Sequence, residues 1–145
     1  PTRRSSDLQS SFKTEISDHF DDSWLALQDD YGVAELMRGY PALYASVFDG
    51  DKLIGVGRTS HADGWSALSR VFVHLDYRGR GVSKLIVNAL LKSSLEAGIH
   101  KSVLQVDSQN LTAINLYTSL GFKLHHEYVY RAYQKSLTLL SDGCC

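Results

Sequence analysis

Cysteine is nearly absent from this sequence. The two cysteines, Cys144 and Cys145, are adjacent at its end, where they have neither the spacing of metal ligands nor a useful loop to close with a disulfide bond. Proline is equally scarce, and only Pro41 lies in the interior, so no proline-rich linker marks a domain boundary. We therefore expect one domain that depends neither on disulfide bonds nor on a bound metal.

The sequence also lacks long hydrophobic runs and any excess of one charge. No stretch approaches the roughly 20 apolar residues of a membrane-spanning helix, and no charged-then-apolar signal segment opens the chain. The formal net charge is -1, without the basic excess that nucleic-acid or lipid binding normally requires. These absences predict a cytoplasmic protein that has neither nucleic acid nor membrane as a partner.

The chain starts at Pro1 rather than at methionine, and its first eight residues, PTRRSSDL, resemble translated sequencing adapter. Residues 1–9 are therefore expected to be a non-native or disordered leader, and the natural N-terminus is expected to be missing. With 43% hydrophobic and 21% charged residues, the rest is typical of a globular chain. Residues 10–136 are predicted to form the folded domain and 137–145 a C-terminal tail.

The first half of the chain predicts two short helices followed by strands. Apolar residues recur at near-helical spacing between Asp21 and Tyr40, with a break near Gly32. From Ala42 onward the period changes to two, and turn residues interrupt the pattern. The expected strands are Ala42–Phe48, Leu53–Ser60 and Trp65–His74, with turns at Asp49–Asp51 and Ala62–Gly64.

The second half alternates between helices and strands. The clearest helix starts at Val82, repeats apolar residues at helical spacing through Leu90, and is expected to end before Gly98. The pattern then predicts a short buried strand, a helix that Gly121 terminates, and a final strand. These elements cover Ser102–Asp107, Ala113–Leu120 and Phe122–Tyr133. Together the elements predict an α/β (α+β) fold, with a mixed sheet and helices on both of its faces.

A strand, a glycine-containing turn and a helix start follow one another between Val71 and Leu90. The first N–H groups of a helix have no intrahelical acceptor and carry partial positive charge, and glycines let a phosphate approach the backbone. Arg78 and Arg80 add positive charge at this place. The segment predicts an anion-binding loop; the alternative is a tight turn whose glycines only satisfy backbone torsion angles.

Two common phosphate-binding loops do not match this segment. A P-loop requires Lys-Ser/Thr directly after its last glycine, whereas Val82 follows Gly81. A dinucleotide-binding loop requires a third glycine three residues after the second, where this chain has Lys84. Both nucleotide-binding interpretations are therefore excluded on pattern.

The loop instead resembles motif A of the GNAT acetyltransferases, Q/R-x-x-G-x-G/A. The matching residues are Arg78-Gly79-Arg80-Gly81-Val82-Ser83. Ser83 replaces the usual glycine or alanine, and Leu75 stands where the family often has proline. A second stretch is similar to the family's motif B, through Leu104-Gln105-Val106, Asn110, Ala113, Leu116-Tyr117 and Gly121-Phe122. The resemblance covers roughly Asp21 to Tyr133 and implies the GNAT fold, with about six to seven strands.

The resemblance also implies acetyl-CoA as the acyl donor. The pantetheine arm would pair with the strand at Val71, Phe72 and Val73, where a backbone N–H near Val73 would polarise the thioester carbonyl. Pyrophosphate would bind the N–H groups from Arg78 to Ser83. The remaining expected site residues are Arg78, Gly79, Arg80, Gly81, Val82 and Ser83 for the cofactor, Asn110 as a helix cap or a pantetheine contact, and Tyr117 as the general acid or a core tyrosine.

The general base is not evident, because Ala67 occupies the position where many relatives carry glutamate. Four substitutes remain open: His61, Asp63, His74 and Glu127. His125 and His126 invite a metal-binding interpretation, but adjacent residues of a strand point to opposite faces, so we expect no metal there.

The predicted activity is direct transfer of an acetyl group from acetyl-CoA to a primary amine of a small molecule or peptide, in a ternary complex. The alternative is a catalytically lapsed CoA-binding regulatory module or half of a two-domain acetyltransferase. The acceptor is expected to meet three variable segments, Trp24–Tyr40, Ala62–Trp65 and the strand around Tyr128. An exposed sheet edge makes a homodimer a further expectation.

Overall fold

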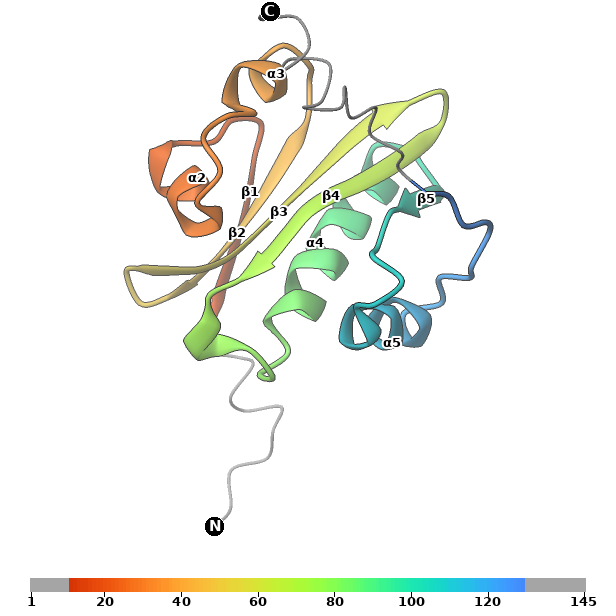
Figure 1. Cartoon of the computed structure of the whole chain (residues 1–145). Coiled ribbons are helices and arrows are strands. Elements are labelled where there is room, and N and C mark those ends of the chain that lie inside the picture. The colour runs from red at the N-terminus through yellow and green to blue at the C-terminus, as the bar shows by residue number, and fades with distance from the viewer. Residues whose placement is uncertain (1–10, 130–145) are drawn as a thin grey trace, which may run out of the picture. The chain divides into compact units, whose positions relative to one another are not determined.

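The computed structural model describes residues 11–129, which belong to two compact units (Figure 1). The first unit ends at Gln109 and the second begins at Asn110. The predicted leader 1–9 and tail 137–145 lie outside the described residues, as do 130–136 of the predicted domain. The two units are described one after the other.

The first unit contains a mixed sheet of five strands in chain order. The strands are β1 Lys13–Ser17, β2 Leu43–Asp49, β3 Lys52–Ala62, β4 Trp65–Val73 and β5 Lys101–Leu104. Strands β1 to β4 pair antiparallel, and β5 pairs parallel to β4. The predicted hairpins and the mixed sheet are confirmed.

The number and extent of the strands differ from the prediction. The described residues form five strands rather than six to seven, and the prediction of a final strand is wrong for Phe122–Val129; its last part, 130–133, lies outside the described residues. Alternating apolar residues form a strand only where another strand edge pairs with them. The predicted buried strand is the short β5, whose Val103 is exposed. Strand β1 was not predicted, because most of its side chains are exposed and it has no clear alternation.

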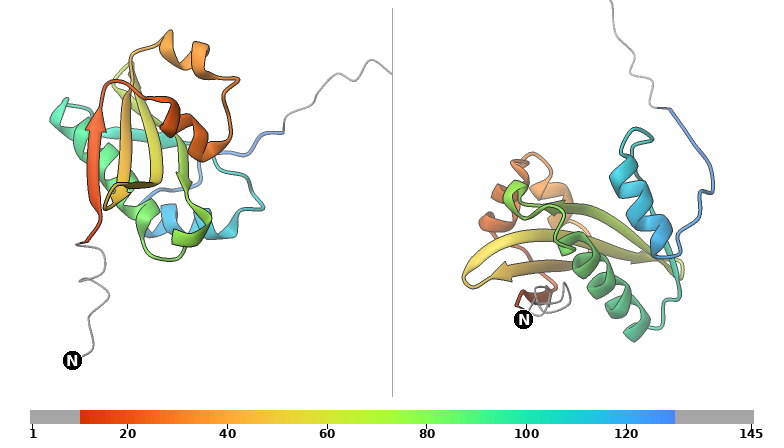
Figure 2. Two further views of the ribbon diagram at one scale, coloured as in Figure 1. Left: turned by 90° about the vertical axis from the view of Figure 1, so that its left-hand side faces the viewer. Right: turned by 90° about the horizontal axis from the view of Figure 1, so that it is seen from below.

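Two short helices cover one face of this sheet, and one long helix covers the other (Figure 2). Helices α2 (Asp22–Gln28) and α3 (Ala34–Arg38) match the predicted pair. Asp21 begins α2, because its carboxylate accepts the Trp24 N–H at 3.0 Å. The core on this face consists of Trp24, Leu25, Ala34, Met37, Tyr44 and Val56.

Helix α4 (Val82–Glu96) packs on the opposite face, where two glycines of β3 let it approach the backbone closely. A Cβ atom on Gly55 would lie 2.7 Å from Val82, and one on Gly57 would lie 2.4 Å from Ile86. Both distances are too short for real carbon contacts. The two glycines therefore set how closely α4 packs on the sheet.

We expect Gly57→Ala to lower the free energy of unfolding by about 1–3 kcal/mol, because the added methyl group overpacks the interface with α4. Chemical denaturation measures the change. Gly32→Ala is the matched control, since a Cβ atom there would lie 3.9 Å from its nearest neighbour, a carboxylate oxygen of Asp30. In an Ile86→Ala background the cost of Gly57→Ala should shrink; an undiminished cost would show that the contact with Ile86 is not the cause.

The second unit is built around helix α5 (Leu111–Ser119). The side chain of Asn110 accepts the Ala113 N–H at 3.2 Å and starts the helix. At the other end Gly121 has φ +96°, and the Phe122 N–H donates to the Tyr117 carbonyl at 3.0 Å. The predicted helix and its glycine stop are confirmed.

Candidate functional site

Strand β4 extends further than β5, the strand that pairs with it on one edge. The last β4–β5 pair is Leu68 with Leu104, whereas β4 continues to Val73. No strand of the described chain pairs with this side of β4 after Leu68. Because the His74 N–H donates to Ile54 of β3 at 2.8 Å, alternation directs the N–H and C=O of Val73 to the open side.

A β-bulge lies within the same part of β4. Arg58 pairs with Ser69 and Val56 with Phe72, so Gly57 faces both Arg70 and Val71. Arg70 has φ +58°, a conformation that a non-glycine residue adopts only when its surroundings enforce it. Its guanidinium forms an ion pair with Asp30, which lies between α2 and α3. The bulge therefore places Ser69 and Arg70 together on the face that carries α2 and α3.

The open edge leads directly into a glycine loop at the start of α4. After the 3-10 turn Leu75–Tyr77, Gly79 and Gly81 adopt φ +77° and +78°. Gly81 is the N-cap of α4 and supplies no side-chain cap, so the first N–H groups of the helix remain available to an anion. The first intrahelical bond runs from the Leu85 N–H to the Gly81 carbonyl at 3.1 Å.

The two arginines of the loop are held by neighbouring aromatic rings. The Nε of Arg78 donates to the Val73 carbonyl at 3.2 Å, and its guanidinium lies 5.4 Å from the Phe72 ring centre. The guanidinium of Arg80 lies 5.1 Å from the Tyr77 ring centre. All predicted cofactor-binding residues from Val71 to Ser83 thus form one continuous segment along the end of β4, the loop and the first turn of α4.

Two predicted site residues, Asn110 and Tyr117, belong to the second unit. The capping role expected for Asn110 is present. The Tyr117 ring lies 6.0 Å from that of Phe122 in an edge arrangement. Burial raises the pKa of the Tyr117 phenol, so the hydroxyl stays protonated at neutral pH and keeps a proton to donate.

Each of the two histidines considered as general base, His61 and His74, has one ring nitrogen in a hydrogen bond. The Nδ1 of His74 accepts the Asp76 N–H at 3.1 Å, which in the neutral ring leaves the proton on Nε2. The Nε2 of His61 lies 3.0 Å from the Ser94 hydroxyl of α4. The carboxylate candidates, Asp63 and Glu127, are both exposed, so none of the four residues is singled out.

The paired histidines do not lie on a strand, so the expected alternation of their side chains is wrong. The Nδ1 atoms of His125 and His126 are 2.8 Å apart in a hydrogen bond. The two side chains nevertheless remain a pair, because the described residues contain no group of three or more potential ligands. None of the described helices is long and apolar enough to cross a membrane.

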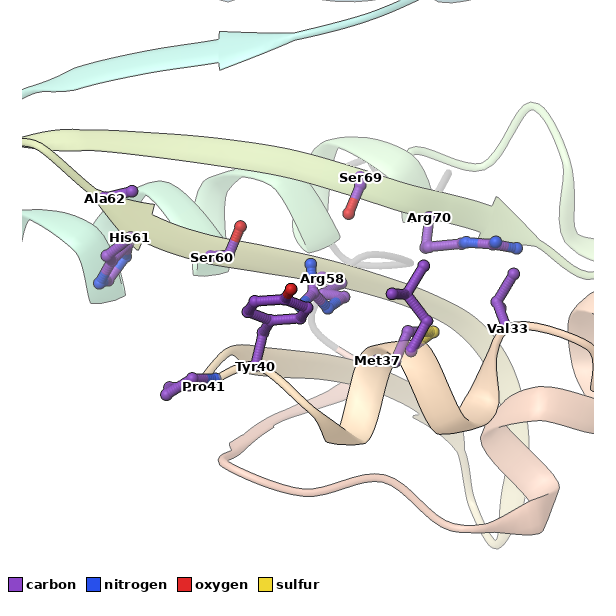
Figure 3. A pocket seen from close by; sticks show the side chains of 11 residues that line it. Val33, Met37, Tyr40, Pro41, Arg58, Ser60, His61, Ala62, Ser69 and Arg70 are labelled. Carbon is purple, nitrogen blue, oxygen red and sulfur yellow. The ribbon is translucent and has the colours of Figure 1, made fainter.

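A cavity of about 480 Å³ lies beside the bulge, between α3 and strands β3 and β4 (Figure 3). Its lining includes apolar residues of the predicted acceptor segment and polar residues of the sheet. The lining residues are Val33, Leu36, Met37, Tyr40, Pro41, Arg58, Ser60, His61, Ala62, Ser69 and Arg70. The arginines could not be recognised from the sequence, because nothing in the strand pattern marks the bulge.

Comparison with known proteins places this arrangement in a family. The sequence model of the Acetyltransferase (GNAT) family matches residues 6–122. The uncharacterized N-acetyltransferase YobR of Bacillus subtilis is 31% identical over 88 residues, which cover 61% of this chain and 36% of that protein. The L-amino acid N-acyltransferase MnaT of Escherichia coli is 29% identical over 92 residues, covering 61% and 54%. The chain thus matches only about a third to a half of the length of these two relatives.

Solved structures with a similar fold also include acetyltransferases. The structure of an aminoglycoside N-acetyltransferase in complex with CoA superposes with a TM-score of 0.68 at 16% sequence identity, covering 84% of this chain and 99% of that one. At this identity the likeness concerns the fold, which has a mixed sheet with helices on both faces. The family match over most of the chain decides the assignment: this chain belongs to the GNAT acetyltransferase family.

Proposed function

We propose that the chain is an acetyl-CoA-dependent N-acetyltransferase that acetylates a primary amine of a small molecule. The observation that carries the proposal is the parting of β4 from β5 directly before the glycine loop. An extended pantetheine arm can add to the open edge between Ser69 and Val73 as a strand would. The pyrophosphate that follows it then meets the helix start at Gly81.

The loop suits the anionic half of the donor. The N–H groups at the start of α4 are not capped by a Gly81 side chain, and the helix dipole favours negative charge there. Arg78 and Arg80 are exposed and contribute charge without a fixed salt bridge among the described residues. Within the described part of the chain, no heavy atom beyond Gly79 and its two chain neighbours lies within 4 Å of the position that a Cβ on Gly79 would take, which leaves space for phosphate oxygens.

In the proposed reaction the amine nitrogen attacks the thioester carbonyl carbon. The C–N bond forms as negative charge develops on the carbonyl oxygen, and the Val73 N–H on the open side stabilises this charge. The C–S bond then breaks, the departing thiolate takes a proton from the Tyr117 hydroxyl, and solvent returns a proton to the phenolate. The amine releases its proton to water or to one of the candidate bases. The only cysteines, Cys144 and Cys145, are not needed, because the acetyl group passes directly to the amine.

The acceptors of the relatives differ widely. Their names include L-amino acids, L-methionine sulfoximine and its sulfone, and aminoglycosides. All carry an amine, which supports the reaction class rather than one compound. Peptide acceptors and a homodimer stay predictions.

Calorimetric titration with acetyl-CoA tests the donor site. We expect a Kd of about 1 μM, or roughly -8 kcal/mol. S-acetylpantetheine is the matched control: it retains the thioester and the arm but lacks pyrophosphate and nucleotide, so it should bind at least about 100-fold more weakly.

Turnover is then followed as thiol released from acetyl-CoA with a panel of primary amines. Equal affinity for both donors would contradict the role of the loop. Tight acetyl-CoA binding without thiol release for any amine would instead support the catalytically lapsed module.

A further inference from the structure

The cavity beside the bulge is lined by a half-buried arginine, Arg58, that has an unused hydrogen-bond donor. The Nε atom of Arg58 is buried and has no hydrogen-bond partner among the described residues. Leaving such a donor unpaired is costly, and more so for a charged group. The guanidinium is held 5.9 Å from the ring centre of Tyr44, which restricts its position without giving Nε a hydrogen-bond acceptor. The Nε atom itself is closed to solvent, but the rest of Arg58 is partly exposed and lines the cavity, so a ligand oxygen would meet the guanidinium from that side.

The charge of the cavity selects the kind of ligand. Arg58 and Arg70 both line it, but Arg70 is neutralised by its ion pair with Asp30. No carboxylate is among the described residues that line the cavity. The remaining positive charge is therefore that of Arg58, which favours a carboxylate and disfavours a polycationic amine.

The part of the wall that comes from α3 and the residues next to it is apolar. Val33, Leu36 and Met37 come from the region of α3, and Tyr40 and Pro41 follow it. The relative solvent exposure of Leu36 is 66% and that of Tyr40 is 64%. This wall therefore has apolar surface that a ligand could bury. A ligand with an aliphatic side chain and a carboxylate would meet both kinds of wall.

The cavity also adjoins the open edge of β4. Ser69 and Arg70 line it, and both follow the last β4–β5 pair at Leu68. An amine on the carbon next to the bound carboxylate would therefore lie close to the edge where the thioester is proposed to sit. Amine and carboxylate on one carbon define an α-amino acid.

We propose that the acceptor is an apolar α-amino acid whose carboxylate is bound by Arg58 and whose side chain lies against the apolar wall. This inference rests on the proposed function. It makes Arg58 a specificity-determining residue, since it acts on the carboxylate and not on the reacting amine.

The test compares L-leucine with L-leucinamide, which has the same side chain and amine but no carboxylate. In the whole chain with saturating acetyl-CoA, we expect kcat/KM for leucine to exceed that for leucinamide by about 10- to 100-fold, the range of one charge-assisted hydrogen bond. The amide has the more easily deprotonated amine, so amine basicity cannot produce this preference. Arg58→Met should lower the leucine value to that of leucinamide and leave leucinamide unchanged within about threefold.

The ratio of kcat/KM for leucine to kcat/KM for leucinamide, measured within one variant, does not depend on the fraction of folded protein. Partial unfolding of Arg58→Met therefore cannot mimic the result. Arg38→Met is the control, because Arg38 is an exposed arginine of α3 that does not line this cavity. It should keep the wild-type preference. Equal kcat/KM for leucine and leucinamide in the wild type, or an equal fall of both in Arg58→Met, would overturn the proposal.

Binding separates this inference from the proposed function. Calorimetry with leucine and leucinamide, with and without CoA, reports on the cavity even if no turnover occurs. Tighter binding of leucine that Arg58→Met abolishes supports the cavity assignment, and absence of that preference contradicts it. Failure of the proposed function would appear separately, as no acetyl-CoA binding or no thiol release with either amine.

Discussion

Replacing Gly81 by glutamate should raise the Kd for acetyl-CoA by at least about 100-fold. Gly81 is the N-cap of α4, so the new carboxylate would lie beside the first helical N–H groups. It would accept their hydrogen bonds itself and repel the pyrophosphate of the donor. Calorimetric titration of the folded variant measures the loss.

The control for this variant is Gly98→Glu at the other end of the same helix. Gly98 has φ +79°, against +78° for Gly81, so both variants carry a similar strain of about 1–2 kcal/mol for a left-handed side-chain-bearing residue. Only Gly81→Glu puts a charge at the proposed phosphate site. We expect Gly98→Glu to bind acetyl-CoA within about threefold of the wild type. Retained affinity in folded Gly81→Glu would mean that the pyrophosphate binds elsewhere.

Tyr117→Phe should lower kcat by about 10²- to 10³-fold, with KM changed by no more than about threefold. The substitution removes the hydroxyl that is proposed to protonate the departing thiolate and keeps the ring that contacts Phe122. Steady-state kinetics of thiol release gives both constants. Tyr31→Phe, which changes an exposed tyrosine, should leave kcat unchanged.

The pH dependence gives an independent check on Tyr117. The phenol donates only while protonated, and burial raises its pKa above the ordinary value of about 10. The rate of the wild-type enzyme should therefore fall only as the pH rises through this raised pKa. The fall should be missing from the residual activity of Tyr117→Phe. An unchanged kcat in the variant would remove Tyr117 from the mechanism.

The elements that the sequence predicted well are those whose signals are local. The period of apolar residues from Val82, with Gly81 before it and Gly98 after it, defines α4 because helix starts and stops depend on nearby residues. The turns at Gly50 and Gly64, with φ +59° and +78°, defined the hairpins for the same reason. The residues proposed for the donor site, from Val71 to Ser83, lie in such local elements, so their position on a strand, a loop and a helix start could be predicted.

The cavity that we propose for the acceptor depends on features that no local pattern contains. The bulge at Arg70 adds one residue to β4 and so reverses the alternation of its side chains. Before the bulge the even-numbered residues Ser66 and Leu68 face α4, and after it the odd-numbered residues Val71 and Val73 do. A prediction that continued the period of two through the whole strand would place the side chains of one half of β4 on the wrong face of the sheet. No glycine marks the position, because Arg70 itself adopts the positive φ.

The pairing of strands could not be predicted from the sequence either. Residues 122–129 alternate as those of β2 do, but β2 has a strand on each edge, whereas 122–129 form no strand. Whether an alternating segment becomes a strand depends on which free edge it meets, and that is a property of the whole fold.

The close packing of α4 on Gly55 and Gly57 has a consequence for how acetyl-CoA would bind at the proposed site. With its side chains seated directly on the backbone of β3, the helix cannot slide or tilt without separating from the sheet. The N–H groups beside Gly81 are therefore preorganised, and a phosphate meets them without first ordering the loop. Acetyl-CoA should accordingly associate in a single kinetic phase, with no slow isomerisation of the protein after the encounter.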